Sequence, residues 1–416
     1  MDPATGLLTQ YHRQMRSEVF RSAVAIVSLW LSVTACVSAQ SEHNQDAAGS
    51  ENPKWTWSWD AKAFVGWNYQ RRKFRDFQEF ESQNWLMGAG ERTAAKGRWR
   101  FEGMISLEPF TIQPLGSPEV FQTGETYQQA PLIDYQHPHD LFMALGGSYD
   151  RTMRSVRAFL EVDAVGSPAL GPAPFMHRPS AAENPTAPLS HHMLDSTHVT
   201  PGVVTAGAEH GSLTVAGSWF RGLEPDENRK DIDFGRLDSW SLQGKWRRKG
   251  WEAQASGAHL KTPEWVEPFN DVTRLTASVA FTRSDGHLAT LVAWGQNREV
   301  HGNLDGYLLE ATLRPSSRHA WYTRAELVTK DILGARGRHP RGFTHFHPLS
   351  RVGALTGGYV FDAFTSRAGI FGFGGDATIY NVAANLLDSY GAPASFHVFL
   401  RYRPTRASIH SMQSMQ

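Results

Sequence analysis

The chain has 416 residues, and its 41 basic and 41 acidic side chains cancel at pH 7. This balance excludes the strong positive field that attracts nucleic acid, so we expect no nucleic-acid partner. Cys36 is the one cysteine, and if it is removed by processing, the mature chain can form neither a disulfide nor a thiolate metal site within it.

The N-terminal segment has the order of features found in secretory signal peptides. Arg16 and Arg21 precede an apolar run over 23–35, and small residues follow up to Ala39. These features predict a signal peptide over 1–39, with Met15 as a possible late start. The stretch 33–36 also resembles a lipobox, so cleavage before Cys36 with lipidation stays open as the alternative. Residues 40–54 are small and polar, and we expect a disordered leader there.

From residue 55 to residue 403 the chain breaks into about sixteen strand-like segments. Their side chains alternate in character, as in 274–282, where Leu275, Val279 and Phe281 occupy one face and Arg274 and Ser278 the other. Such alternation predicts strands with one apolar face. After the signal segment, no apolar run approaches the roughly 20 residues of a membrane-spanning helix.

The joints between these segments alternate in length along the chain. The short ones are 95–98, 150–154, 209–212, 247–250, 283–286, 314–318 and 363–367, and the long ones are 112–139, 171–197, 222–236, 261–271, 297–304 and 331–347. Short turns at one end and long loops at the other are typical of bacterial outer-membrane barrels. We therefore predict an all-β fold, a single transmembrane antiparallel β-barrel of about 16 strands over 55–403, followed by a tail over 404–416. The turns would be periplasmic and the loops extracellular. The alternative is a soluble all-β protein such as a propeller or tandem sandwich.

Four sequence motifs resemble those of known outer-membrane proteins. The stretch 396–402 (FHVFLRY) resembles the closing-strand signature of bacterial outer-membrane barrels, although here fourteen residues follow it. The stretches 136–142 (QHPHDLF), 175–179 (FMHRP) and 190–198 (SHHMLDSTH) are similar to uncharacterised porin-like outer-membrane proteins associated with metal-handling loci. The resemblance implies insertion into outer-membrane lipid by the barrel-assembly machinery. It implies no established activity.

Histidines gather on the side of the long loops, whereas His210, His287 and His319 fall at the short turns. Imidazole is a common ligand for late first-row metals, and an acid can complete the shell. We expect the loops to converge on a copper or zinc site drawn from His137, His139, His177, His191, His192, Asp195, His198, His345 and His347. The alternative is that these histidines only fix the loop conformation through hydrogen bonds. The spacing matches no standard zinc motif.

These features predict a porin-like channel for passive or loop-gated passage of small solutes or ions, and we expect no enzymatic activity. A barrel of sixteen strands is wide enough for an aqueous path. Two alternatives are an outer-membrane lipid hydrolase that uses residues such as Ser190, His191 and Asp195, and a soluble periplasmic all-β binding protein. The hydrolase lacks a G-x-S-x-G motif.

Overall fold

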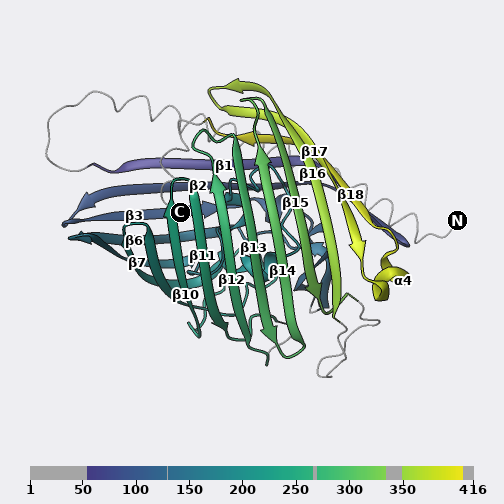
Figure 1. Ribbon diagram of the computed structural model, residues 1–416, viewed down its shortest axis with the longest axis horizontal. Coiled ribbons are helices and arrows are strands. Elements are labelled where there is room, and N and C mark those ends of the chain that lie inside the picture. Colours follow the sequence, from purple (N-terminus) through teal and green to yellow (C-terminus); the bar gives the residue numbers. More distant parts are fainter. Residues whose placement is uncertain (1–53, 129, 266–268, 334–348, 406–416) are drawn as a thin grey trace.

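The computed structural model describes residues 54–128, 130–265, 269–333 and 349–405. Sixteen strands close into one barrel, in which the first strand pairs with the last and all neighbours are antiparallel (Figure 1). The predicted barrel is confirmed. In chain order its strands are β1 (Thr56–Arg72), β2 (Arg75–Ala94), β3 (Gly97–Ile105), β6 (Phe142–Met153), β7 (Val156–Gly166), β8 (Thr200–His210), β9 (Leu213–Phe220), β10 (Ser239–Arg248), β11 (Trp251–Leu260), β12 (Val272–Thr282), β13 (Leu288–Glu299), β14 (Gly302–Leu313), β15 (His319–Lys330), β16 (Ser350–Ser366), β17 (Gly369–Val382) and β18 (Ala394–Arg403).

The alternation in the sequence separates the outer wall of the barrel from its lumen. Val279, Tyr307 and Leu309 are about half exposed on the outer face, whereas Arg274 and Glu310 on the same strands are buried inside. A lipid bilayer favours this arrangement, because strands in lipid need apolar outer side chains and an edge-free sheet.

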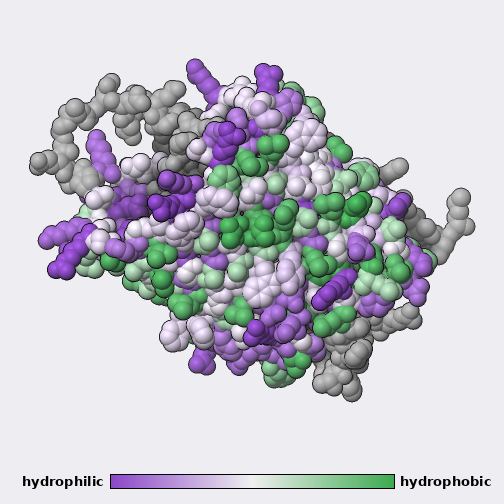
Figure 2. All heavy atoms as spheres, in the orientation of Figure 1, coloured by the Kyte–Doolittle hydropathy of each residue, from purple (hydrophilic) through white to green (hydrophobic). Residues whose placement is uncertain are grey.

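Aromatic side chains frame the apolar outer face at both ends of the strands. Trp240 is 55% exposed near one end of β10, and Trp246 is 38% exposed near the other. Figure 2 shows apolar residues over the middle of the wall and hydrophilic residues toward the strand tips. Tryptophan and tyrosine at these heights suit the two interfaces of a membrane.

The two rims of the barrel differ in the length of their joints. We define the turn rim by the joints 95–96, 154–155, 211–212, 249–250, 283–287, 314–318 and 367–368. The loop rim carries the joints 73–74, 106–141, 167–199, 221–238, 261–271, 300–301, 331–349 and 383–393. The predicted long joint 297–304 was wrong, because β13 and β14 continue to pair as far as Glu299 and Gly302.

The remaining elements belong to the joints of the loop rim. They are α2 (Glu108–Thr111), β4 (Ser117–Tyr127), β5 (Ala130–Gln136), η1 (Phe175–His177), α3 (His191–Leu194), η2 (Ser196–His198), η3 (Ala384–Leu386) and α4 (Leu387–Tyr390). Strands β4 and β5 form a separate two-stranded sheet. Among the described residues, no helix is long and apolar enough to cross a membrane.

Candidate functional site

The two longest joints, 106–141 and 167–199, fold into the lumen, and we call them the inner loops. Met193 of α3 is almost fully buried, and its carbonyl lies so close to Gly295 of β13 that a side chain there would clash. Phe121 of β4 is fully buried and stacks on Tyr390 of α4 at a ring-centroid distance of 4.3 Å. The inner loops therefore form a core inside the barrel.

The second inner loop crosses the lumen from wall to wall. Hydrogen bonds or ion pairs join it to nine of the sixteen strands: β1, β9, β10, β11, β12, β13, β14, β15 and β18. Lys62 Nζ of β1 donates to the Ala182 carbonyl at 2.5 Å, and Gln243 Nε2 of β10 donates to the Gly171 carbonyl at 2.8 Å. The loop is thus attached to opposite walls of the barrel.

Buried charges fix this loop to the wall. Arg178 donates to Glu310 of β14 at 2.9 and 3.0 Å and to Asp195 at 2.5 Å. Burial lowers the pKa of Arg178, but Glu310 and Asp195 more than offset it and leave the pKa raised. Burial raises the pKa of Asp195, and Arg178 and His191 reverse this, so its pKa lies well below the usual range. Both groups are charged at neutral pH.

Two further acids complete the attachment of the second inner loop. Glu183 pairs with Arg314 and lies 3.5 Å from Arg401 of β18. Glu326 of β15 accepts hydrogen bonds from the backbone N–H of Leu189 at 3.1 Å and from the N–H and hydroxyl of Ser190 at 3.0 and 2.8 Å. Because the Ser190 hydroxyl is committed to Glu326, it does not donate to the neighbouring His191.

Histidines from both inner loops meet at the centre of this packing. The His198 ring lies 5.3 Å from the His139 ring and 5.2 Å from the His191 ring, measured between centroids. His191 and His192 are 5.4 Å apart, and His137 and His139 are 6.4 Å apart. The expected convergence of His137 and His139 with the 191–198 segment is present.

In three of these rings, the Nδ1 atom contacts an oxygen acceptor. Nδ1 of His139 lies 2.8 Å from Glu108, Nδ1 of His191 lies 2.8 Å from Asp195, and Nδ1 of His198 lies 2.8 Å from the Asp195 carbonyl. Nε2 of His198 is buried and has no hydrogen-bond partner among the described residues. Metal-binding histidines commonly donate one ring N–H to an oxygen acceptor, which orients the ring and leaves the other ring nitrogen free for the metal.

Burial lowers the pKa of three of these histidines. It lowers the pKa of His198 well below 6.5, and His191 and His139 lower it further. It also lowers the pKa of His192 and of His137 well below 6.5. Burial lowers the pKa of His139 too, but Glu108 outweighs it and leaves that pKa raised. Neutral imidazole is the form that binds metals.

The other expected ligands do not all join the cluster. His177 packs on Trp85 of β2 at 4.7 Å between ring centroids, and burial lowers its pKa to about 4. His345 and His347 lie outside the described residues. Among the described residues, the carboxylates of Asp226, Asp231 and Asp233 bring three ligand atoms within 4.8 Å of one another. No group of three that includes a histidine does so in this part of the chain. The rings would have to turn before sharing one ion.

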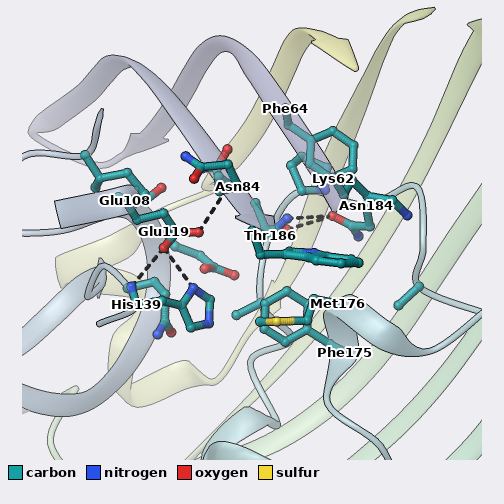
Figure 3. Close-up of a pocket in the computed structure, with 18 of the residues that line it drawn as sticks. Lys62, Phe64, Asn84, Glu108, Glu119, His139, Phe175, Met176, Asn184 and Thr186 are labelled. Carbon is teal, nitrogen blue, oxygen red and sulfur yellow. Dashed lines mark hydrogen bonds and ion pairs between the residues drawn. The ribbon is translucent and has the colours of Figure 1, made fainter. Parts of the chain in front are cut away.

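A pocket lies between the inner loops and the β1–β2 wall (Figure 3). Lys62, Phe64 and Trp85 line the wall side, and His139, Phe175 and Met176 line the loop side. Glu119 of β4 also lines it, and burial raises the pKa of Glu119 to about 8. The pocket adjoins the histidine cluster through His139 and His137.

No sequence pattern indicated that several other residues belong to this site. Glu108 follows a strand end, and Glu125 pairs with both His137 and Arg229. Arg229 comes from a third joint, 221–238, and its second contact is Asp140 at 3.4 Å. Acids and an arginine in loops are common, so only the three-dimensional contacts identify these residues.

No family model and no curated protein matches the sequence. Among solved structures, the chain is similar to OmpF of Salmonella typhi in complex with daunomycin, with a TM-score of 0.52 and 8% identity over 83% of this chain and 97% of that one. An anion-selective porin from Comamonas acidovorans has a TM-score of 0.49 and 11% identity over 84% and 100%. The fold is porin-like. Identities this low say nothing about the solute.

Proposed function

We propose that the protein is a channel in the outer membrane of a Gram-negative type cell, with a lumen narrowed by the two inner loops. The apolar outer wall and its aromatic ends support the membrane location. The attachment of loop 167–199 to nine strands carries the rest of the proposal. An empty barrel of sixteen strands would hold a wide aqueous path, and a loop across its centre restricts passage to small solutes or ions.

We further propose that the histidine cluster binds a transition-metal ion such as Cu²⁺ or Zn²⁺ in this constriction. His139, His191 and His198 are the candidate ligands, because their rings are neighbours and an oxygen acceptor holds each Nδ1. The unpartnered Nε2 of His198 is the specific observation in support. Binding requires the rings to turn until their nitrogens reach about 2.0–2.1 Å from a zinc ion.

Single-channel conductance of the refolded full chain in planar bilayers tests both proposals. We expect small conductance steps, and we expect Zn²⁺ or Cu²⁺ to reduce them further while Mg²⁺, which prefers oxygen ligands, does not. Steps as large as those of an unobstructed sixteen-strand porin would contradict the constriction. Small steps that respond equally to Zn²⁺ and Mg²⁺ would contradict the metal site and leave the constriction standing.

A further inference from the structure

The turn rim carries a ring of exposed basic side chains. Six of its seven joints have at least one exposed lysine or arginine at or next to the turn, the exception being 211–212. The exposed residues are Lys96, Arg151, Arg154, Arg247, Arg248, Lys249, Arg283, Arg318 and Arg367. They are distributed around the circumference of the barrel, one hairpin after another, and form no single cleft.

The acids at this rim are already paired. Asp150 binds Arg98 at 2.9 Å, and Glu209 binds Arg157 at 2.7 Å. Glu252 binds Arg247 at 2.5 Å, and Asp285 binds Arg283 at 2.9 Å. The remaining cations of the ring form no ion pair with any acid in the part of the chain that the structure describes: Lys96, Arg151, Arg154, Arg248, Lys249, Arg318 and Arg367. The rim therefore presents an excess of positive charge.

Strand geometry determines the position of the cations along the barrel axis relative to the aromatic residues. On β10, Trp246 and Arg248 are two positions apart, and on β6 Tyr149 and Arg151 have the same spacing. Side chains two apart share one face of a strand, so each arginine extends from the outer face one step beyond an aromatic residue. Aromatic rings mark the membrane interface, and a long cation just beyond them reaches the level of lipid headgroups.

The described part of the loop rim mixes charges of both signs. Its joints expose acids such as Asp231, Asp238 and Asp388 among exposed cations such as Arg236 and Arg351. Arginine binds phosphate oxygens through two parallel hydrogen bonds, and lysine binds them as a point charge.

We propose that the turn rim binds the phosphate headgroups of anionic phospholipids in the membrane leaflet that borders it. The proposal rests on the barrel lying in a bilayer and is independent of conductance and of the metal site. A lipid is favoured over a soluble anion because the cations are spread around the rim, and Arg151 and Arg248 extend from the outer face beyond an aromatic residue. Bound anionic lipid would fix the depth and direction of the barrel in the membrane.

Lipid selectivity around the full-length barrel tests this. The barrel is refolded into nanodiscs of phosphatidylcholine that contain a minor share of phosphatidylglycerol, and spin-labelled lipids report which headgroup is enriched at its surface. A basic residue at an anionic surface changes the local binding constant about fivefold. We expect enrichment of phosphatidylglycerol in the parent and a fall of at least about fivefold in R151Q/R248Q/R318Q. The control R236Q/R298Q/R351Q removes the same charge from the loop-rim side and should retain the enrichment.

Three outcomes would overturn the proposal: no preference in the parent, an equal loss in both triple variants, or complete competition by soluble glycerol phosphate. If R151Q/R248Q/R318Q fails to insert, the salt dependence of the parent protein still tests the proposal. Its preference for phosphatidylglycerol should disappear at about 1 M salt, where screening acts over about 3 Å, because the cations are exposed. A preference that survives high salt would come from something other than this ring.

Discussion

Arg178 and Glu310 form a two-pronged ion pair across the lumen, with distances of 2.9 and 3.0 Å between residues 132 positions apart. Both side chains are nearly inaccessible to solvent, and Arg324 binds the same carboxylate at 3.2 Å. This pair joins the second inner loop to β14 and is one of the buried contacts that hold the loop in the lumen.

Replacement of Arg178 by methionine should release the loop. Removing one partner of a buried pair costs about 3–5 kcal/mol when the other charge is left without compensation; here Arg324 still pairs with Glu310, so we expect a cost below this range. Here Asp195 loses a partner as well. We expect larger conductance steps and faster proteolysis of the loop in R178M. The matched control is R283M, which breaks an exposed pair with Asp285 that water screens strongly. Identical behaviour of the two variants would show that the pair does not hold the loop.

The outer face of β12 gives a direct test of membrane insertion. Val279 is 47% exposed on the apolar wall. An arginine at this position should cost about 2–4 kcal/mol if it lies near the middle of the bilayer. Folding of V279R into vesicles, followed by heat-modifiable migration on gels, should show a loss of inserted protein relative to V279L. Equal insertion of both variants would place this face away from lipid.

The direction of the barrel can be determined on intact cells. An epitope at Gly235 in the joint 221–238 should be reachable from outside, because this loop-rim position is exposed and is not folded into the lumen. An epitope at Ser316, on the opposite rim, should be reachable only after the outer membrane is opened. Labelling of Ser316 alone on intact cells would mean that the barrel is inserted the other way round.

Local sequence patterns were enough to predict the barrel. Apolar and polar side chains alternate along the strands, as Val279 and Arg274 show, and turn-forming residues occur at the short joints. The two-residue joint 300–301 was missed because the polar residues around it read as a long loop, although they continue the pairing of β13 and β14.

The interior of the barrel could be predicted only in part. Counting the strands shows at which end of the barrel each histidine lies. The sequence could therefore predict that His137 and His139 lie near the 191–198 segment. The inward fold of the loops depends on contacts such as Arg178–Glu310 and Glu326–Ser190, between residues more than 130 positions apart. A single sequence carries no local signal for such pairs.

The buried acid Glu119 should make stability depend on pH. Burial raises its folded-state pKa from 4.5 to about 8, so between these values the folded chain holds a proton that the unfolded chain has lost. The stabilisation is fully present below pH 4.5 and is lost as pH rises toward 8, with a slope of up to about 1.4 kcal/mol per pH unit. Urea unfolding of the refolded barrel at a series of pH values measures this slope. It should be smaller in E119Q and unchanged in the exposed control D388N. An unchanged slope in E119Q would assign the pH dependence to other groups.

The histidine cluster should bind transition metals if its rings can turn toward one ion. Calorimetry on the refolded chain at pH 7.5 should show saturable binding of Zn²⁺ or Cu²⁺, because His198 and His192 are neutral there. The double variant H191A/H198A removes two of the proposed ligands and should weaken binding at least about tenfold. H139A should also weaken binding, because His139 comes from the other inner loop and its ring lies next to that of His198. The control H210A/H287A changes two exposed histidines at the turn rim and should leave binding unchanged. Equal effects of the two double variants would mean that the cluster only orders the inner loops through the hydrogen bonds of Glu108 and Asp195.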